Sequence, residues 1–493
     1  MITKNILRIF LAVLTVLAVA SCVIVMALLL RSCSDWDSLL FDIVETTAPP
    51  TETALSDTDS EETRGETAED MTDEEEITLS ETEEEVTTDG ETREEITTAE
   101  EETTEEETTE EETTEEEPIA SEGLVFKFNS NGTCSVGGIG TCTDTDIVIP
   151  TTYNGKKVTS IGDSAFFQCN HLTSIVIPSS VTSIDDSAFF GCHRLTSIAI
   201  PTSVTSIGNS AFSNCNGLTS IVIPDSVTSI GDRAFSYCTN LTSIIISDSV
   251  TNIGKATFSG CDRLTSITVA KGNTVFHDDG NCLIETASKT LIAGFKHSVI
   301  PVDGSVTNIG NHAFYYSDLT SITIPDSVTS IGEYAFADCV FLTSIEIPDS
   351  VTSIGKWAFY GCTGLTSIVI GDSVTSIGDY AFRGCTGLTE IVIPDGVTSI
   401  GTSAFRDCTS LTTVTLGTHV KGIGDLAFRG CSSLTSFVIP GSVTSIGESA
   451  FGRCSDLTDI YFTGTESEWN AISKGSAWDD GTGSYTVHYN YVP

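Results

Sequence analysis

The chain has 493 residues, of which 69 are acidic and 22 basic, so its formal net charge is −47. Most of this charge lies in residues 35–118, which contain 36 Asp or Glu and two Arg. Phosphate affinity depends on a surface rich in Lys and Arg, so the composition argues against a general nucleic-acid-binding protein, and the length argues against a single compact domain.

The N-terminus predicts a membrane anchor. Residues 9–30 are 22 consecutive uncharged, mostly aliphatic residues. As a helix they would be about 33 Å long, which is enough to span a hydrocarbon core of about 30 Å. Lys4 and Arg8 precede this run, and acidic residues soon follow Arg31. This asymmetry predicts a cytoplasmic N-terminus and an extracellular remainder.

Two other interpretations fit the same stretch. Residues 18–20 resemble a signal-peptidase site, and residues 19–22 resemble a bacterial lipobox in which Cys22 is lipidated. Either cleavage normally leaves a polar mature end, whereas residues 23–30 continue the apolar run, so the retained anchor is favoured. All three interpretations place the body of the protein outside the cytoplasm.

Residues 35–118 are built mainly from Thr and Glu and end in repeats of Thr-Thr-Glu-Glu-Glu. Such a tract has too little apolar surface to offset the chain entropy lost on folding, and its like charges repel, so we expect it to be disordered and extended. One interpretation is a stalk, with many Thr hydroxyls open to glycosylation. The other is a solvated linker that only needs to stay soluble.

From residue 158 onward the sequence repeats. One unit, LTSIVIPDSVTSIGDRAFSYC, runs from Leu218 to Cys238, and within each of two series its Phe returns every 23 residues, with one step of 22. A fixed period in this range indicates a solenoid with one supersecondary unit per coil. The Phe occupies positions 166, 189, 212, 235 and 258, and then 314, 336, 359, 382, 405, 428 and 451.

Each unit predicts a short strand and a short helical turn. Leu218, Ile221 and Ile223 have the spacing of a parallel strand whose alternate residues face the core. Gly231 allows a tight bend, and Asp232 is suited to cap a helical turn on which Ala, Phe and Cys share one face. One coil cannot bury these groups alone, so stacked coils should form ladders of Leu, Ile, Phe and Cys.

The unit LTSIxIPxSVTSIGxxAFxxC resembles the BspA-like leucine-rich repeat, found in surface proteins of bacteria and some protists. Twelve units carry the pattern, and the resemblance covers about residues 124–493. The longer gap between Phe258 and Phe314 resembles a variant unit of this class, with Cys282 at a usually aliphatic position. The resemblance implies a curved solenoid and, for some members, adhesion or host-protein binding. It implies no catalytic residues.

These observations divide the chain into five predicted segments. The solenoid should have about 13 coils of 23 residues, with a parallel strand ladder and short helical turns, and both caps should be structural. The segments are a signal anchor or transmembrane helix (1–34), a disordered Thr/Glu-rich stalk (35–118), an N-terminal β-hairpin cap (119–157), the leucine-rich-repeat solenoid with its variant unit at about 264–313 (158–460), and an aromatic C-terminal cap (461–493).

The 16 cysteines of an exported protein would normally suggest disulfides. Eleven of them share one repeat position, where neighbouring coils lie about 4.8 Å apart, whereas a relaxed disulfide needs Cβ atoms about 3.8 Å apart. We therefore predict buried thiols that act as small apolar side chains. Cys134 and Cys142 are candidates for one disulfide. The ladder cysteines are Cys169, Cys192, Cys215, Cys238, Cys261, Cys339, Cys362, Cys385, Cys408, Cys431 and Cys454.

Sequence motifs of common enzymes and metal sites are missing. There are no C-x-x-C pairs, no His-rich cluster, no H-E-x-x-H, no G-x-S-x-G and no G-x-x-x-x-G-K. Most repeat positions are accounted for by the coil itself. The sequence therefore predicts no catalysis, no metal and no cofactor.

Variation within the repeat indicates a candidate ligand-binding strip. Two residues before the repeat Phe most coils carry a small residue, but His312 is followed there by three larger aromatic residues. Aromatic side chains leading into arginines suit a sugar, an anionic glycan or a protein segment. The alternative is that these side chains cover the coil flank and pair with Asp379, Asp407 and Asp425. The candidates are Tyr334, Trp357 and Tyr380, with Tyr360, Arg383, Arg406 and Arg429 just after the Phe.

A second candidate surface is the smooth row of Ser, Val and Thr at outward strand positions, expected on the concave face. Taken together, the sequence favours a monomeric, membrane-anchored cell-surface protein for non-enzymatic recognition of or adhesion to host proteins, glycans or other cells. Its partners would be the membrane, through the N-terminal helix, and an extracellular ligand, but not nucleic acid. The alternative is a structural spacer or coat protein without a specific ligand.

Overall fold

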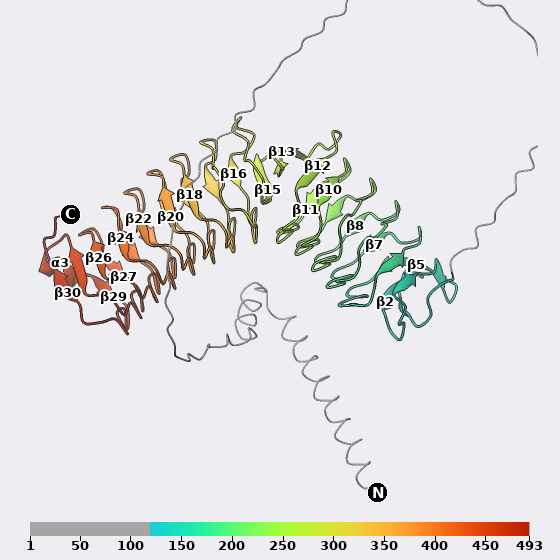
Figure 1. The fold of residues 1–493 in the computed structure, drawn as a ribbon, viewed down its shortest axis with the longest axis horizontal. Coiled ribbons are helices and arrows are strands. Elements are labelled where there is room, and N and C mark those ends of the chain that lie inside the picture. Colours follow the sequence, from blue (N-terminus) through green and yellow to red (C-terminus); the bar gives the residue numbers. More distant parts are fainter. Residues whose placement is uncertain (1–118, 493) are drawn as a thin grey trace, which may run out of the picture. The chain divides into compact units, whose positions relative to one another are not determined.

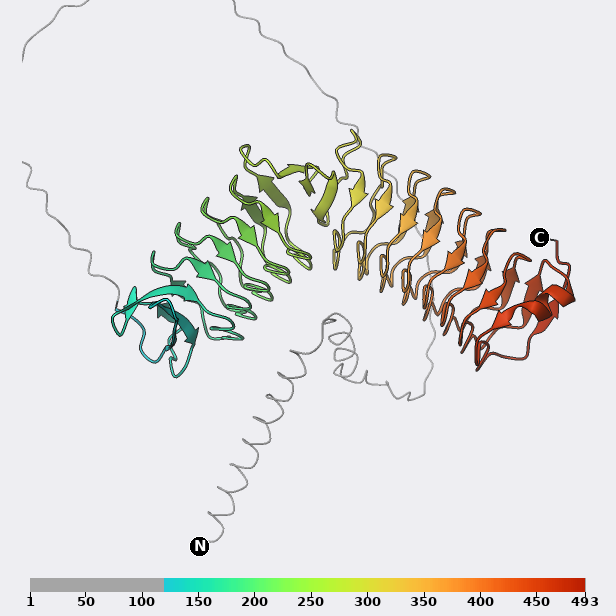
Figure 2. The ribbon, with the colours of Figure 1, turned by 180° about the vertical axis from the view of Figure 1, so that it is seen from behind.

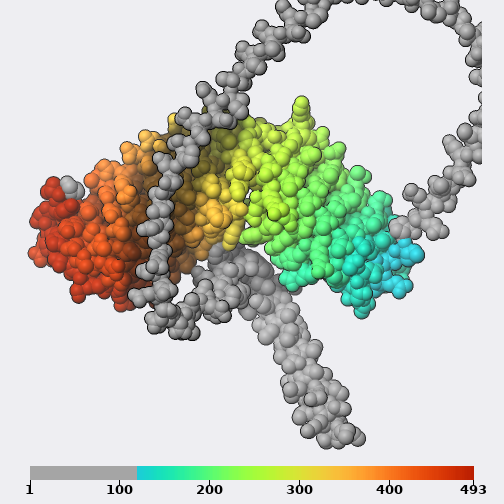
Figure 3. All heavy atoms as spheres, in the orientation of Figure 1, coloured from blue at the N-terminus to red at the C-terminus, as the bar shows by residue number. Residues whose placement is uncertain are grey.

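The computed structural model describes residues 119–492, which form a solenoid with one repeat per turn (Figures 1 and 2). The coils pack side by side from the N-terminal to the C-terminal cap (Figure 3). The predicted membrane helix, Cys22 and the Thr/Glu-rich segment lie outside the described residues. No helix in the described part of the chain has the length and apolar character needed to cross a membrane.

The first row of parallel strands consists of the predicted L-x-x-I-x-I segments. Ser344 pairs with Ser367, so the register advances by one repeat per coil, and Ile345 and Ile347 are buried while Ser344 is exposed. This confirms the predicted strand. The row contains β3 (Asp146–Val148), β6 (Ser174–Val176), β10 (Ser243–Ile246), β12 (Ser266–Val269), β18 (Ser344–Ile347), β20 (Ser367–Ile370), β22 (Glu390–Val392), β24 (Thr413–Thr415), β26 (Ser436–Ile439), β28 (Asp459–Phe462) and β30 (Thr486–His488).

A second row of parallel strands follows the Val-Thr-Ser-Ile-Gly segments, where the sequence analysis expected only a return to the core. Most of its strands are two residues long, and a Thr before most of them bonds to the previous coil, as Thr205 Oγ1 does to Thr182 O at 3.2 Å. The row contains β5 (Lys156–Ile161), β7 (Ser183–Ile184), β8 (Ser206–Ile207), β9 (Ser229–Ile230) and β11 (Asn252–Ile253), then β15 (Thr290–Gly294), β16 (Asn308–Ile309), β17 (Ser330–Ile331), β19 (Ser353–Ile354), β21 (Ser376–Ile377), β23 (Ser399–Ile400), β25 (Gly422–Ile423), β27 (Ser445–Ile446) and β29 (Ser473–Lys474).

The segment around the repeat Phe is not helical, so the prediction of short helical turns was wrong. The residue two positions before the Phe has φ between 49° and 61° in the regular coils, and the residue two positions after it is also left-handed. A right-handed helix cannot contain such residues. The backbone instead makes successive tight turns, and alternate N–H groups reach the next coil, as Phe359 N–H does to Ala381 O at 2.7 Å. We call this third set of inter-coil hydrogen bonds the turn row.

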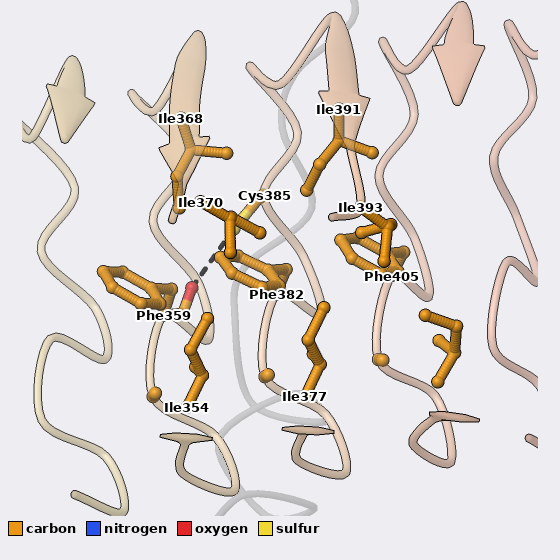
Figure 4. Packing of buried hydrophobic residues seen from close by; sticks show 14 of the residues in the cluster. Ile354, Phe359, Ile368, Ile370, Ile377, Phe382, Cys385, Ile391, Ile393 and Phe405 are labelled. Atoms are coloured by element: carbon orange, nitrogen blue, oxygen red, sulfur yellow. Dashed lines mark hydrogen bonds between the residues drawn. The ribbon is translucent and has the colours of Figure 1, made fainter. Parts of the chain in front are cut away.

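The core between these rows consists of stacked identical side chains (Figure 4). Neighbouring Phe rings in the regular coils stack with centroids 5.0–5.9 Å apart, for example Phe359 and Phe382 at 5.1 Å. Each fully buried side chain of this size contributes about 1.5–3 kcal/mol. Ladder cysteines also donate to the preceding coil, and Cys385 Sγ lies 3.1 Å from Phe359 O (Figure 4).

All eleven ladder cysteines are buried and free in the structure. Cys134 and Cys142 are also free, so the structure does not contain the disulfide considered for them. The reason is that β2 (Cys134–Gly138) directs Cys134 Sγ toward the carbonyl oxygens of Lys156 and Lys157, 3.6 Å from each. Cys282 in the variant unit is buried as well.

The N-terminal cap contains a hairpin of β1 (Val125–Phe128) and β2, and β4 (Thr152–Tyr153) pairs with β5. Residues 147–149 do not belong to this hairpin, because β3 pairs with β6 in the first strand row. At the other end, α3 (Glu466–Ala471) begins with a capping box between Thr465 and Glu468, and β29 and β30 continue both strand rows. The solenoid therefore has about 15 turns rather than 13.

The variant unit differs from the regular coil by an antiparallel sheet of β13 (Phe276–Asp279), β14 (Cys282–Glu285) and β15. Figure 1 shows β13 and β15 between the coils that end with β12 and those that begin with β16. Leu283 packs with the core of the N-terminal coils, whereas Ile284 packs with the core of the C-terminal coils. Gly294 is required here, since an added Cβ would lie 2.1 Å from the Phe314 ring.

Candidate functional site

Four aromatic side chains on consecutive coils form a continuous stack, which includes three of the predicted ligand-binding residues. Ring centroids are 5.0 Å apart for His312 and Tyr334, 5.7 Å for Tyr334 and Trp357, and 3.9 Å for Trp357 and Tyr380. The four residues share one repeat position and one left-handed backbone conformation, so their rings project in parallel. We call these four residues the aromatic stack.

Stacking determines which parts of the aromatic rings a ligand can contact. Trp357 is covered on one face by Tyr334 and on the other by Tyr380, with interplanar angles of 4° and 1°. Tyr360 packs edge-on against Trp357 at 5.0 Å, and Arg383 lies over Tyr360 at 5.7 Å. A ligand therefore meets ring edges, because the faces of Trp357 are already occupied.

Beside the aromatic stack, arginines follow one another on three consecutive coils, and we call them the arginine row. Asp407 lies 3.7 Å from Nε of Arg383 and 3.2 Å from Nε of Arg406. These side chains are partly exposed, so such pairs contribute at most about 1 kcal/mol each. The row consists of Arg383, Arg406 and Arg429, and Arg429 makes no ion pair with any residue of the described solenoid.

In the alternative interpretation, the arginines pair with three acidic neighbours. The structure shows such pairs for only one of the three. Asp407 forms the expected pairs, but Asp379 Oδ1 accepts the N–H of Thr402 at 2.8 Å and Asp425 Oδ1 accepts the N–H of Glu448 at 2.7 Å. These two carboxylates therefore serve the inter-coil contacts of the backbone. Asp232 does the same for Lys255 N–H, so it caps the next coil rather than a helical turn.

A cluster of tyrosines next to the variant unit was not predicted from the sequence. Tyr316 packs edge-on against Tyr237 at 5.2 Å and against Tyr315 at 4.6 Å. Tyr315 also contacts Tyr334, at 5.9 Å, and so connects the cluster to the aromatic stack. The only sequence signal was the 22-residue step of the Phe ladder between positions 314 and 336, which marks this coil as irregular.

Asp338 lies in the same cluster. Burial raises the pKa of its carboxyl group to about 7, and a hydrogen bond from Tyr316 opposes part of that rise. A carboxyl group that titrates near neutral pH is unusual, and such groups gather at functional sites and in structural networks alike. Here the hydrogen bond from Tyr316 makes this carboxyl group part of the structural network of tyrosines.

The outward strand positions form the smooth surface that the sequence predicted. Val222 is 72% exposed and Val392 is 62% exposed, with Ser220 in the row beside Val222. Glu346 and Glu390 interrupt these rows. Its grouped aromatic side chains, Tyr461 and His488, lie on the last two strands of the row and have no arginine beside them in the outward strand positions, so the aromatic stack and the arginine row remain the stronger candidate site.

Within residues 119–492, no group of three or more His, Cys, Asp or Glu side chains has an arrangement that could hold a metal ion. The thiols are poor ligands as well, because the ladder cysteines are buried and burial raises the pKa of Cys385 to about 12. A thiol must lose its proton to bind a metal strongly. The aromatic stack and the arginine row are thus suited to non-covalent binding, through van der Waals contacts and electrostatic attraction.

The parallel strand rows and the repeated Leu and Ile ladders define a leucine-rich-repeat solenoid protein. The model of the BspA type leucine rich repeat region matches six copies, over residues 159–282, 307–395 and 375–474, and the chain belongs to this family. No curated protein matches the sequence.

Three solved structures illustrate the similarity. A leucine-rich repeat protein from Bacteroides ovatus is 29% identical, with a TM-score of 0.48, over 74% of this chain and 92% of that one. A leucine rich cell surface protein from Faecalibacterium prausnitzii is 30% identical, with a TM-score of 0.43, over 73% and 98%. The pneumococcal vaccine antigen PcpA is 18% identical, with a TM-score of 0.51, over 75% and 98%, and shares the fold.

Proposed function

We propose that this is a cell-surface recognition protein that binds an extracellular protein or glycan through the aromatic stack and the arginine row. Membership of the BspA type family suggests surface protein binding or adhesion, and leucine-rich-repeat solenoids are generally not enzymes. The observation that carries the proposal is the arginine row itself. Three guanidinium groups follow one another on consecutive coils, and two of them, those of Arg383 and Arg406, pair with the same carboxylate, that of Asp407.

The geometry favours an extended anionic ligand. Successive coils are about 4.8 Å apart, so the guanidinium groups can meet carboxylate or sulfate groups at that spacing or at twice it. Arginine binds such groups with two parallel hydrogen bonds. The edges of Trp357 and Tyr380 lie beside the row and add apolar contact area for a sugar ring or a peptide side chain.

A glycan and host-protein array probed with the full chain tests this proposal. Saturable binding to an anionic ligand is expected, and Arg406→Ala combined with Arg429→Ala should weaken it at least about tenfold, because two charge-assisted contacts are lost. The matched control is Arg194→Ala combined with Lys271→Ala, which removes the same charge from exposed positions elsewhere. Equal binding by the two folded double variants contradicts the proposal.

The second candidate function is a surface spacer or coat element without a specific ligand. The regularity of the Ser, Val and Thr rows favours it, because such rows are explained by strand packing alone. Binding that never saturates and is not competed by free ligand would support this alternative. The array therefore separates the two functions.

The proposed surface location includes the predicted anchor at 1–34 and the Thr/Glu-rich stalk at 35–118. Membrane fractionation of the producing cell, followed by mass spectrometry of the N-terminus, distinguishes the possibilities. An intact Met1 in the membrane fraction supports the retained anchor, lipid on Cys22 supports a lipoprotein, and cleavage after Ala20 supports a secreted protein. Recovery of the protein only from the cytoplasm contradicts the proposed location.

A further inference from the structure

The arginine row and the aromatic stack belong to two adjacent lines of side chains on one flank of the solenoid. Tyr360 shares the repeat position of the arginines, and Trp357 belongs to the aromatic stack. Their rings pack edge-on with centroids 5.0 Å apart, so the two lines are in contact. Leu426 continues the line of the aromatic stack in the coil of Arg429 and is partly exposed. A partner on this flank therefore meets a cationic line next to a largely apolar one.

The step between coils on this flank can be measured from the Phe ladder. Ring centroids are 5.2 Å apart for Phe382 and Phe405 (Figure 4), and also 5.2 Å apart for Phe405 and Phe428. The rings of each pair lie within 5° of parallel, so this distance represents the step from one coil to the next. Each arginine of the row directly follows one of these Phe residues, so the row advances by the same step.

That step matches one turn of an α-helix. The pitch of an α-helix is about 5.4 Å, so side chains one turn apart on a helix along the flank face consecutive coils, with a mismatch of about 0.2 Å per coil. The register therefore holds over the whole arginine row. An extended peptide fits less well, because its side chains on one face are about 6.6–6.8 Å apart and are displaced by about 3 Å at the third arginine.

The arrangement of the aromatic rings favours a protein segment over a glycan. Sugar rings are usually held on the open face of an aromatic ring, but Tyr334 and Tyr380 cover the two faces of Trp357. Arg383 lies over the ring of Tyr360, 5.7 Å from its centroid. Aliphatic side chains need no open ring face, because they gain dispersion energy against ring edges as well.

We propose that the partner at this site is a protein that lays an acidic amphipathic helix along the flank. This inference rests on the proposed function and narrows its ligand to one kind of protein segment. One carboxylate per turn pairs with each guanidinium group of the arginine row, while aliphatic side chains beside the carboxylates contact Trp357, Tyr380 and Leu426. A helix of about 12–14 residues is long enough to cover these coils.

Three blocked, fluorescently labelled peptides test the proposal with the full chain. The first, AELAQELAELQAELAQ, carries glutamate once per helical turn with leucine beside it. The second has glutamine in place of every glutamate, and the third has proline in place of the alanine before the third glutamate, which breaks the helix but keeps the charge. Fluorescence anisotropy should show saturable binding of the first peptide, at least about tenfold tighter than that of either other peptide. Equal binding of the proline peptide overturns the proposal.

Circular dichroism should show that the first peptide gains helix on binding, because a helix of this length is marginal on its own in water. An oligogalacturonate, with one carboxylate per sugar ring, represents the glycan alternative and should bind at least about tenfold more weakly. Tighter binding of the oligogalacturonate than of the first peptide overturns the helix but leaves the proposed function intact. Absence of saturable binding by the peptides, the oligogalacturonate and the array ligands removes the proposed function as well.

Double-mutant cycles test the register of one turn per coil. Arg406→Ala and Arg429→Ala are each combined with each single glutamate-to-glutamine change in the first peptide, and the excess over the product of the two separate effects is the coupling. The two arginines should couple at least about threefold to neighbouring glutamates, one turn apart. The matched control, Arg194→Ala, removes an exposed charge from a distant coil and should couple to none. Coupling of both arginines to the same glutamate, or equal coupling to all of them, overturns the proposal.

Discussion

The thiol of Cys385 lies 3.1 Å from the carbonyl oxygen of Phe359, one coil earlier. The same contact recurs at ten positions of the ladder, with distances of 3.0–3.2 Å. Each of these Phe carbonyls also accepts the N–H of the ladder residue in its own coil, which is Cys except for Ser317 in the coil of Phe314, so the thiol uses the second lone pair of the carbonyl oxygen. Cysteine thus combines the size of a small apolar side chain with a weak donor at a position that faces a carbonyl group.

Replacing one ladder cysteine should have a modest cost. Cys385→Ala removes a weak hydrogen bond and a buried sulfur atom, but Phe359 O keeps its bond from Cys362 N–H, so we expect a loss of about 0.5–1.5 kcal/mol. Thermal unfolding followed by circular dichroism measures it, with Thr386→Ala as the control in the same coil. An unchanged melting temperature would show that the thiol contact contributes nothing.

The described thiols should be unreactive in the folded protein. Burial raises the pKa of Cys215, Cys261 and Cys454 to about 12, and only the thiolate reacts with a disulfide reagent. Titration with such a reagent at pH 8 should label the described cysteines slowly under native conditions and quickly in denaturant. Cysteines that remain unreactive in denaturant until a reductant is added would indicate disulfides, contrary to the structure.

The left-handed position before the repeat Phe predicts opposite effects of two glycine substitutions. Ala256 has φ of 53°, so Ala256→Gly removes backbone strain and should stabilise by about 0.5–1 kcal/mol. Ala234 has an ordinary φ, so Ala234→Gly should destabilise by about 0.5–1 kcal/mol or more. Chemical denaturation of both variants measures the difference. The same sign for both would contradict the assigned backbone conformation.

Asp338 predicts a pH dependence of stability. Burial raises the pKa of its carboxyl group from 3.8 to about 7, so the folded state binds the proton more tightly than the unfolded state does. Its contribution to stability is therefore fully present below about pH 4 and is lost as the pH rises toward 7. Asp338→Asn should stabilise at pH 8 by on the order of 1–3 kcal/mol, with little effect at pH 4. Melting temperatures at both pH values test this, and an equal shift at the two would contradict it.

Asp407 predicts a gain of binding at the arginine row. Asp407→Asn removes the carboxylate shared by Arg383 and Arg406, so an anionic ligand should bind several-fold more tightly while stability changes by less than about 1 kcal/mol. The control is Asp349→Asn, which removes an exposed carboxylate two coils away. Weaker binding by Asp407→Asn would mean that Asp407 itself contacts the ligand.

The period made much of the fold predictable. Ile221, Phe235 and Cys238 recur at fixed positions of the repeat. A residue that recurs once per coil must stack on its counterpart in the next coil, so the repeat spacing alone predicted the first strand row, the core and the thiol ladder. The aromatic stack followed in the same way, because Tyr334, Trp357 and Tyr380 share one repeat position. The interpretation of the Phe segment as helical failed because Ser, Arg, Tyr and Trp have no strong local preference for positive φ.

The sequence by itself determined which residues repeat, which of them face the core, and on which coils the aromatic and arginine residues follow one another. Only the tertiary structure decided how these residues are used. Hydrogen bonds between coils hold the turn row in its left-handed conformation, and stacking covers both faces of Trp357. Each of these outcomes depends on what a neighbouring coil presents, and that partner is a full repeat or more away along the chain.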